Sequence, residues 1–428
     1  MKLLTNEFNP PKHLRHLMST HNNYIISIMP VRLLVIFLSM IFLNITYSQT
    51  FPILGSEIAI NVLYLPQGYV LSNLSGYGYS KTMGDVSNIG NMNPASLSSF
   101  NSLNCGFSYQ YDSKIRNAWV EDIGYYKNKN GLPQSAGFIY PVKDFRLGVA
   151  FSQRYNGSVE TDPILIRTVE HPEGTGEYAA TTIDYNFISY SLLGSWTLPN
   201  AFAQNDKLSF GIRYDLNRFS TYEKIWNEVW KGSFYGSSFA LGITYDQTSD
   251  NVLKYRLSLF FEKGASINGS PQLQGTDLRT LAHDTTGTGE STNNQTEPEY
   301  SESGNIPDKL NLGADITISP VVCISSNFTY VYWNKIGSAQ NQPEISLTAV
   351  YKTSDALSLS LGTIFTMYNP SYNSSLYVGN KLNALYLTAG TVIHYRLIDL
   401  SIALADSHLT SDEWRRQTVG MISLNFHL

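Results

Sequence analysis

The chain has 428 residues, of which 43% are hydrophobic and only 15% are charged, and its formal net charge is −5 at pH 7. This acidic balance argues against a nucleic-acid partner, because such proteins present clustered basic residues. Aromatic residues are abundant at 13%, and the chain contains 29 tyrosines. Few charges and many tyrosines suit a membrane barrel with aromatic belts, but they also suit a secreted tyrosine-rich β protein.

Residues 1–48 are predicted to be an N-terminal extension and signal peptide. Arg32 precedes an apolar core at Leu33–Leu43, which is too short to span a bilayer. Thr46 and Ser48 supply the small residues of a cleavage site, so we expect cleavage after about Ser48 and export of the remainder. The rest of the sequence holds no apolar run of helical-span length, so any membrane residence requires strands.

Residues 49–100 are predicted to form a hatch, or plug, that precedes a barrel. The stretch Asn73–Leu97, NLSGYGYSKTMGDVSNIGNMNPASL, has neither helical nor strand periodicity and closes on Asn93-Pro94-Ala95. Proline removes a backbone donor there and biases Asn93 away from helix. Such a glycine-rich segment is either a surface linker or a plug inside a closed barrel, where backbone must approach backbone closely.

Residues 101–428 are predicted to form an all-β fold, a transmembrane antiparallel barrel of about 14 strands. Outward apolar and inward small or polar residues alternate over about ten residues per strand, which is the outer-membrane pattern. A slip in this pattern between Phe187 and Ile188 predicts a bulge in the fourth strand. Short connections on one rim and long ones on the other agree with the topology of such barrels. The predicted strands are 103–113, 133–141, 145–155, 182–197, 206–220, 234–246, 254–264, 308–318, 321–334, 342–352, 356–368, 382–394, 397–406 and 416–428.

Two stretches carry a resemblance to a known family. The segment SGYGYSKTMGDVSNIGNMNPASL leads directly into the first strand, and residues 306–336 read IPDKLNLGADITISPVVCISSNFTYVYWNKI. Both resemble the FadL/TodX-type outer-membrane transport proteins, whose hatch ends in the same Asn-Pro-Ala. The resemblance implies passive transport of hydrophobic compounds such as long-chain fatty acids. It also implies sideways exit at a kinked third strand, for which this sequence offers only Gly148.

The resemblance further implies a bacterial outer-membrane location. The implied partners are hydrophobic small molecules or fatty acids, outer-membrane lipid and, during biogenesis, the barrel assembly machinery. No enzyme activity, cofactor or metal is expected, since the histidines lack ligand spacing and no Gly-x-Ser-x-Gly elbow occurs. The same fold includes shuttles of the type IX secretion system, which is the alternative function. A barrel hydrolase is a distant alternative.

Alternation places a set of charged residues on the lumen face. A network of ion pairs that holds the wall together is one interpretation. The other is that a cation left over from such pairing holds a ligand carboxylate. The set comprises the cations Arg146, Arg213, Lys254, Arg256 and Lys309, with Asp215 and Asp315.

A second candidate binding surface lies in the predicted loop after the fifth strand, within Tyr222–Tyr235. Its four apolar members fall at helical spacing: Ile225, Trp226, Val229 and Trp230. This spacing predicts one apolar stripe on an exposed loop. The stripe is either a loop helix packed on the rim or a capture surface for apolar ligands, and membrane-interface tryptophans would look similar.

The two cysteines are predicted to remain thiols. Alternation puts Cys105 on the lipid face and Cys323 on the lumen face of the wall. Side chains on opposite faces cannot reach disulfide geometry.

Overall fold

The computed structural model describes residues 85–113, 115–116, 125–128, 133–160, 163–165, 170–225, 228–248, 254–264, 266–269, 272–274, 302–332, 341–367, 383–411 and 416–428. The predicted signal peptide and the first part of the predicted hatch, residues 49–84, lie outside this range. Both domain boundaries therefore stay predictions.

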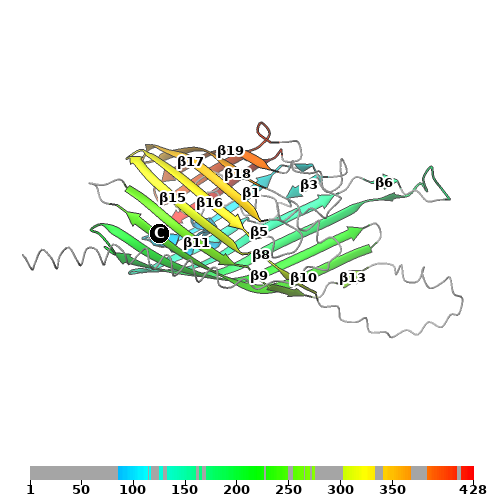
Figure 1. Ribbon diagram of the computed structural model, residues 1–428, viewed down its shortest axis with the longest axis horizontal. Helices are drawn as coiled ribbons and strands as arrows, with labels where there is room; N and C mark the ends of the chain where they lie inside the picture. Colours follow the sequence, from blue (N-terminus) through cyan, green and yellow to red (C-terminus); the bar gives the residue numbers. More distant parts are fainter. Residues whose placement is uncertain are drawn as a thin grey trace, which may run out of the picture.

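Fourteen long strands among the described residues form one closed antiparallel barrel (Figure 1). Each strand pairs with its neighbour in the chain, and β1 pairs with both β4 and β21, which closes the sheet. This confirms the predicted fold class and strand number. The strands are β1 (Asn104–Asp112), β4 (Ser135–Val142), β5 (Phe145–Glu160), β8 (Thr181–Pro199), β9 (Asp206–Ile225), β10 (Glu228–Gln247), β11 (Lys254–Lys263), β15 (Lys309–Ser319), β16 (Val322–Val331), β17 (Gln342–Ser354), β18 (Leu357–Thr366), β19 (Ala384–Tyr395), β20 (Ile398–Asp406) and β21 (Thr418–His427).

Seven short strands lie beyond or beside this wall: β2 (Ile115–Arg116), β3 (Tyr125–Asn128), β6 (Ile164–Leu165), β7 (Tyr178–Ala179), β12 (Ser266–Gly269), β13 (Gln272–Gln274) and β14 (Glu302–Asn305). β12 and β13 continue the pairing of β10 beyond the end of β11. The pair β6–β7 forms a separate two-stranded sheet.

The predicted alternation is realised as an apolar outer face. On β9, Leu208 and the exposed Phe210, Ile212, Tyr214 and Leu216 point outward, and Arg213 and Asp215 are buried on the inner face. This outward run covers nine residues, which is the length that a tilted strand needs to cross a bilayer core of about 30 Å. The outer wall therefore presents a band of membrane thickness.

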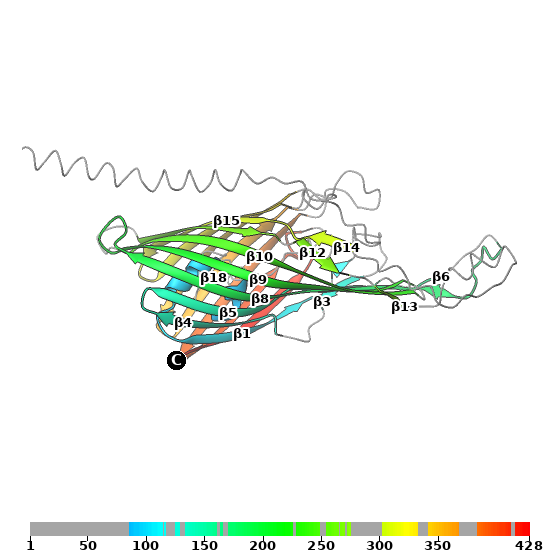
Figure 2. The ribbon, with the colours of Figure 1, turned by 90° about the horizontal axis from the view of Figure 1, so that it is seen from below.

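The two rims differ as predicted. Tight two-residue turns join β4 to β5, β15 to β16, β17 to β18 and β19 to β20, and the C-terminus lies on the same rim. The opposite rim carries the longer connections, including residues 113–134, 161–180 and 264–308. In Figure 2 the long strands β8, β9 and β10 extend well beyond this second rim.

The predicted loop after the fifth strand is instead a hairpin. β9 runs to Ile225 and β10 begins at Glu228. The two strands pair without interruption from Ile225↔Glu228 to Asp206↔Gln247. The helical stripe is therefore wrong, because cross-strand hydrogen bonds hold this backbone extended and neighbouring strand positions face opposite sides. Ile225 and Val229 lie at the far end of the hairpin, Trp230 pairs with Glu223, and Trp226 lies outside the described residues.

The predicted bulge exists, but on the neighbouring strand. β8 is regular at Phe187 and Ile188, and the register shift falls between Gln153 and Tyr155 of β5, opposite those residues. Arg154 is the extra residue. The bulge lets Gln153 be buried against the alternation, whereas Arg154 keeps the inward parity of Ser152, and the side chains of all three residues are buried. The third barrel strand thus has an irregularity, although not at Gly148.

Neither cysteine forms a disulfide, as predicted, and Cys105 and Cys323 lie on strands β1 and β16. No helix in the described part of the chain is both long and apolar enough to cross a membrane.

Candidate functional site

The described end of the predicted hatch, Asp85–Phe100, packs inside the barrel, and we call it the inner segment. It contains two short 3₁₀ helices, η1 (Val86–Asn91) and η2 (Pro94–Ser99). η1 contacts β1, β4, β5, β8 and β21, whereas η2 contacts β5, β8, β9 and β10. Val86, Ile89 and Leu97 are fully buried against wall residues such as Ile139 and Leu193.

Asn93 makes three hydrogen bonds, two of which connect the inner segment to the wall. Its Oδ1 accepts from the Ala95 backbone N–H at 3.0 Å, which caps η2. Its Nδ2 donates to the carbonyls of Ile243 at 3.3 Å and Leu259 at 3.2 Å, on β10 and β11. Pro94 occupies the first position of η2, where its missing N–H has no cost.

The wall carries glycine where this motif passes. A Cβ at Gly242 would lie 1.8 Å from Asn93 Oδ1, and one at Gly211 would lie 2.1 Å from the Ala95 nitrogen. Only a residue without a side chain permits backbone and amide to approach the strands so closely. The predicted motif Asn93-Pro94-Ala95 is thus fitted to β9, β10 and β11.

A buried ion-pair cluster lies next to this contact. The fully buried Arg213 donates from Nε to Asp215 Oδ1 at 2.9 Å and from Nη2 to Glu262 Oε2 at 2.9 Å. Arg154 donates from Nη2 to Asp215 Oδ2 at 2.9 Å and from Nη1 to Glu262. Lys309 Nζ lies 4.0 Å from Glu262 Oε2. Strands β5, β9, β11 and β15 each contribute to the cluster.

The same cluster holds the inner segment. Arg213 Nη1 donates to the carbonyl of Met92 at 3.0 Å, so one guanidinium bonds to the wall cluster and to the backbone before Asn93. Charge-assisted hydrogen bonds of this kind are roughly twice as strong as neutral ones. Displacing the inner segment would therefore disturb the ion pairs.

Aromatic rings border the cluster on its long-loop side. Phe187, Phe219 and Phe234 are buried, and the Phe219 ring contacts the other two at centroid distances of 6.4 Å and 6.2 Å. The guanidinium of Arg154 lies 5.6 Å from the Phe187 ring centre, and that of Arg213 lies 5.6 Å from the ring centre of Phe260. Cations over aromatic faces are stabilised electrostatically, more so when they are desolvated.

The other predicted lumen cations lie elsewhere. Arg146 donates to the backbone carbonyls of Phe100, Lys143 and Phe145, so it fastens the junction between the inner segment and β1. Arg256 forms an ion pair with Asp246 near the short-turn rim. Lys254 is exposed at the start of β11. The structure therefore brings only Arg213 and Lys309 together.

Sequence reasoning missed Arg154 and Glu262. Arg154 has the same parity on β5 as the predicted lumen cation Arg146, so continuing that alternation to residue 154 would have found it. Glu262 follows the same alternation as Arg256 and lies on the lumen face of β11, so a search for acids as well as cations on that face would have found it.

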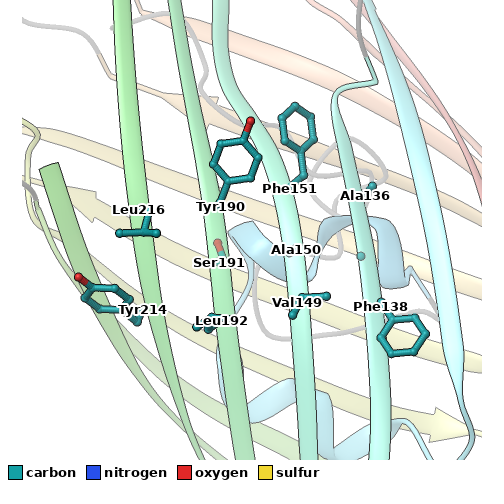
Figure 3. A pocket seen from close by; sticks show the side chains of 11 residues that line it. Ala136, Phe138, Val149, Ala150, Phe151, Tyr190, Ser191, Leu192, Tyr214 and Leu216 are labelled. Carbon is teal, nitrogen blue, oxygen red and sulfur yellow. The ribbon is translucent and has the colours of Figure 1, made fainter. Parts of the chain in front are cut away.

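Outside the wall, an apolar groove of about 530 Å³ lies against β4, β5, β8 and β9 (Figure 3). Phe138, Val149, Tyr190 and Leu216 stand around it on the outer face, whereas its floor contains Ala136, Ala150 and Ser191. Ala150 belongs to the same buried cluster as Val86 and Ile89 of η1. Small side chains therefore leave one thin layer of wall between the groove and the inner segment.

A second apolar hollow, of about 1270 Å³, lies nearer the short-turn rim on β5, β8, β9, β10, β11 and β15. Gly211 and Gly242 belong to its lining, so it lies outside the contact with Asn93-Pro94-Ala95. Trp196 stacks between Phe145 and Phe210 at its edge, each pair at 6.3 Å. Both hollows thus face the inner segment across the wall.

Within the described part of the chain, no group of three or more His, Cys, Asp or Glu side chains is placed to hold a metal ion. The arginines described above and Lys309 are engaged in ion pairs or in hydrogen bonds to carbonyls. The site can bind, orient and hold the inner segment.

Comparison with solved structures finds the same fold. The Ralstonia pickettii toluene transporter TbuX matches with a TM-score of 0.54 and 11% identity, covering 83% of this chain and 99% of that one. A Pseudomonas aeruginosa FadL homologue matches at 0.52 and 12%, covering 85% and 99%. The Pseudomonas putida toluene transporter TodX matches at 0.52 and 14%, covering 84% and 97%.

No family model matches the sequence. No curated protein matches it either. The structural matches span most of this chain and nearly all of each neighbour, so the chain has the FadL/TodX-type barrel fold that the two sequence stretches predicted.

Proposed function

We propose that the protein is a passive outer-membrane transporter of hydrophobic compounds. The observation that carries the proposal is the inner segment packed against a thin wall with apolar hollows outside it. A lumen that holds such a segment suits controlled passage better than free diffusion of water-soluble molecules. The shared fold supports the same function, since two of the neighbours are toluene transporters.

The proposed route begins at the end of the β9–β10 hairpin. Apolar residues on both faces of the hairpin end would capture the ligand, with burial of roughly 0.8 kcal/mol per methylene as the driving force. The positions of Ile225 and Trp230 share the face of Glu223, and Val229 lies on the opposite face. Trp226, which follows Ile225 in the sequence, would belong to the same capture surface. The ligand would then pass the inner segment, which acts as the hatch together with residues 49–84. The bulge at Arg154, beside the groove on β5, is where we propose that it leaves sideways.

Long-chain fatty acids are the more specific ligand class that we propose. Their binding requires a cation that forms an ion pair with the ligand carboxylate. Lys309 is the more accessible cation of the cluster, with 20% of its side chain exposed against 9% for Arg154 and none for Arg213. We propose that Lys309 exchanges Glu262 for the ligand head group. A charged head adds orientation more than affinity, so neutral compounds would not need this contact.

Tracer uptake by cells that carry each variant at matched outer-membrane abundance tests the proposal. Trp226→Ser with Trp230→Ser should slow every hydrophobic tracer, because the change removes capture. Lys309→Gln should slow fatty acids and spare neutral aromatic tracers. Lys254→Gln, at an exposed position, is the matched control. No uptake above an empty-vector strain for the parent protein would exclude transport.

The type IX secretion shuttle remains the second candidate. The observation in its favour is the height of β8, β9 and β10, which have 19, 20 and 20 residues and therefore present a tall surface beyond the membrane. A transporter needs the lumen, and a shuttle needs this surface. Loss of protein secretion in a deletion strain with unchanged tracer uptake would favour the shuttle. No feature of the described residues favours the barrel hydrolase.

A further inference from the structure

The outer face of the β9–β10 hairpin changes character directly above the apolar band. Leu216 is the last exposed aliphatic residue of that face on β9, and the exposed Arg218 follows on the same face. Arg218 pairs across the strands with Tyr235, of which 57% is exposed. A cation and a tyrosine side by side at this height lie where the membrane core ends.

Two further cations continue the same face. Lys224 and Lys231 are both exposed, and Lys231 pairs with Tyr222, its ammonium 5.7 Å from the ring centre. Lys224 pairs with Val229, so Lys224 and Lys231 are diagonal neighbours, about 7–8 Å apart at their backbones. We call Arg218, Lys224 and Lys231, with Tyr222 and Tyr235, the basic ladder.

Uncharged hydrogen-bonding groups fill the space between these cations. The rung between Arg218 and Tyr222 consists of Asn186, Ser220 and Ser233, all partly exposed. Asp184, which pairs with Tyr222, is one acidic neighbour on this face, and the buried Glu223 belongs to the opposite, inner face. The position of Glu160 on β5 lies on the same face as Asp184, two strands from Lys224 and at the same level. Three cations against these two carboxylates leave the described part of the ladder positive.

The height of the ladder selects the ligand. Lys231 lies level with the position six residues beyond Leu216 on β9, and Lys224 lies eight residues beyond it. These separations correspond to about 20–26 Å along the strand. At a strand tilt of about 45°, they correspond to about 14–19 Å along the barrel axis. The headgroup region of a phospholipid bilayer adds only about 5–8 Å on each side of the core. A phospholipid phosphate could therefore reach Arg218 but not the two lysines.

We infer that the basic ladder binds a phosphorylated glycolipid of the outer leaflet, a lipid with several anionic groups stacked along a tall saccharide headgroup. The acyl chains would lie on the apolar band below Leu216, the first phosphate would meet Arg218, and outer anionic groups would meet Lys224 and Lys231. Serine, asparagine and tyrosine side chains suit the sugar hydroxyls and rings between them. This function is independent of transport, because the ladder faces away from the lumen.

The test uses the full-length protein in detergent, titrated with bis-phosphorylated lipid A carrying an inner-core saccharide, and with the same molecule after phosphatase treatment. The parent should bind the phosphorylated form at least about tenfold more tightly. The variant Arg218→Gln/Lys224→Gln/Lys231→Gln should lose this preference. Raising the salt concentration should weaken binding by the parent and leave the triple variant unaffected, because exposed charges are screened.

The control is Lys352→Gln/Arg396→Gln, which removes two exposed cations from the short-turn rim, including an arginine that also lies over a tyrosine. It should bind like the parent. Heat-dependent gel migration checks that every variant is a folded barrel. Equal binding by parent and triple variant would overturn the inference. So would equal, ladder-dependent binding of phosphatidylglycerol vesicles, since that headgroup is too short to need the lysines.

Discussion

The two halves of the barrel wall differ in length and in what their inner faces carry. β5, β8, β9 and β10 have 16 to 20 residues, whereas β15, β16, β18, β20 and β21 have 9 to 11. The long-strand wall carries Arg154, Arg213 and Asp215 of the ion-pair cluster and most contacts with the inner segment, and β11 and β15 complete the cluster with Glu262 and Lys309. The described inner face of the short-strand wall carries small hydroxyl side chains such as Ser325, Ser360 and Ser401, beside a buried apolar cluster that includes Ile364 and Met421.

The two walls of this closed sheet therefore have different structural roles. Short strands of bilayer length only have to close the barrel, and small inner residues leave room in the lumen. The long-strand wall both holds the inner segment and carries surfaces beyond the membrane. Substitutions on the two walls should therefore have unequal effects.

The largest effect is expected for Arg213→Leu. The substitution leaves the negative charges of Asp215 and Glu262 buried with fewer positive partners. Breaking a buried ion pair lowers the free energy of unfolding by about 3–5 kcal/mol. Chemical unfolding in detergent measures this loss. Ser360→Ala, also a buried inward position but on the short-strand wall, should cost about 1 kcal/mol or less. Equal losses for both variants would contradict the division between the walls.

Gly242→Ala should displace the inner segment while the barrel stays folded. The added Cβ would overlap Asn93 Oδ1, and overpacking of this kind costs about 1–3 kcal/mol. Ion conductance in planar bilayers should rise above that of the parent. Gly194→Ala is the matched control, since its Cβ would meet only Ile212, at 3.9 Å. Unchanged conductance of the Gly242 variant would show that the inner segment does not obstruct the lumen.

Asn93→Asp should give a smaller effect of the same kind. Aspartate keeps the acceptor that caps η2 but cannot donate to the carbonyls of Ile243 and Leu259. The loss of hydrogen bonding there costs about 1–3 kcal/mol. Protease accessibility of the inner segment in detergent measures its release. Equal protection of parent and variant would mean that packing on the glycines suffices.

The smallest effect concerns Asp85, which joins the inner segment to the short-strand side. Burial raises the pKa of its carboxyl above the ordinary 3.8, and hydrogen bonds from Ser87 and Asn88 oppose this shift. The folded state therefore holds the proton more tightly than the unfolded state. Stability from this group is present below pH 3.8 and is lost as the pH rises through the raised pKa. Protease protection should fall over that window in the parent and stay constant in Asp85→Asn.

The sequence alone predicted the wall well. Each strand is a local period of two, and outward Phe145, Leu147 and Val149 need no distant partner to be recognised. The strand number followed from counting these segments, and Asn93-Pro94-Ala95 is a motif within the inner segment that the sequence made recognisable. The face of each cysteine followed from the same alternation.

The hairpin and the bulge show why the sequence alone could not predict the remaining structural features. The spacing of Ile225 and Val229 is compatible with a helix, and only pairing between β9 and β10 decides that this backbone is extended. The residues around Arg154 contain no glycine or proline signal at the bulge, which exists only as a register shift against β8.

What the sequence determined by itself is therefore the barrel, its strand number and the facing of each strand, because these depend on the two-residue alternation of neighbouring side chains. The tertiary structure decided which charges meet, because Arg154, Arg213, Glu262 and Lys309 come from four strands and their contact depends on register. It also decided where the inner segment rests, because a glycine in the sequence does not show which backbone passes over it.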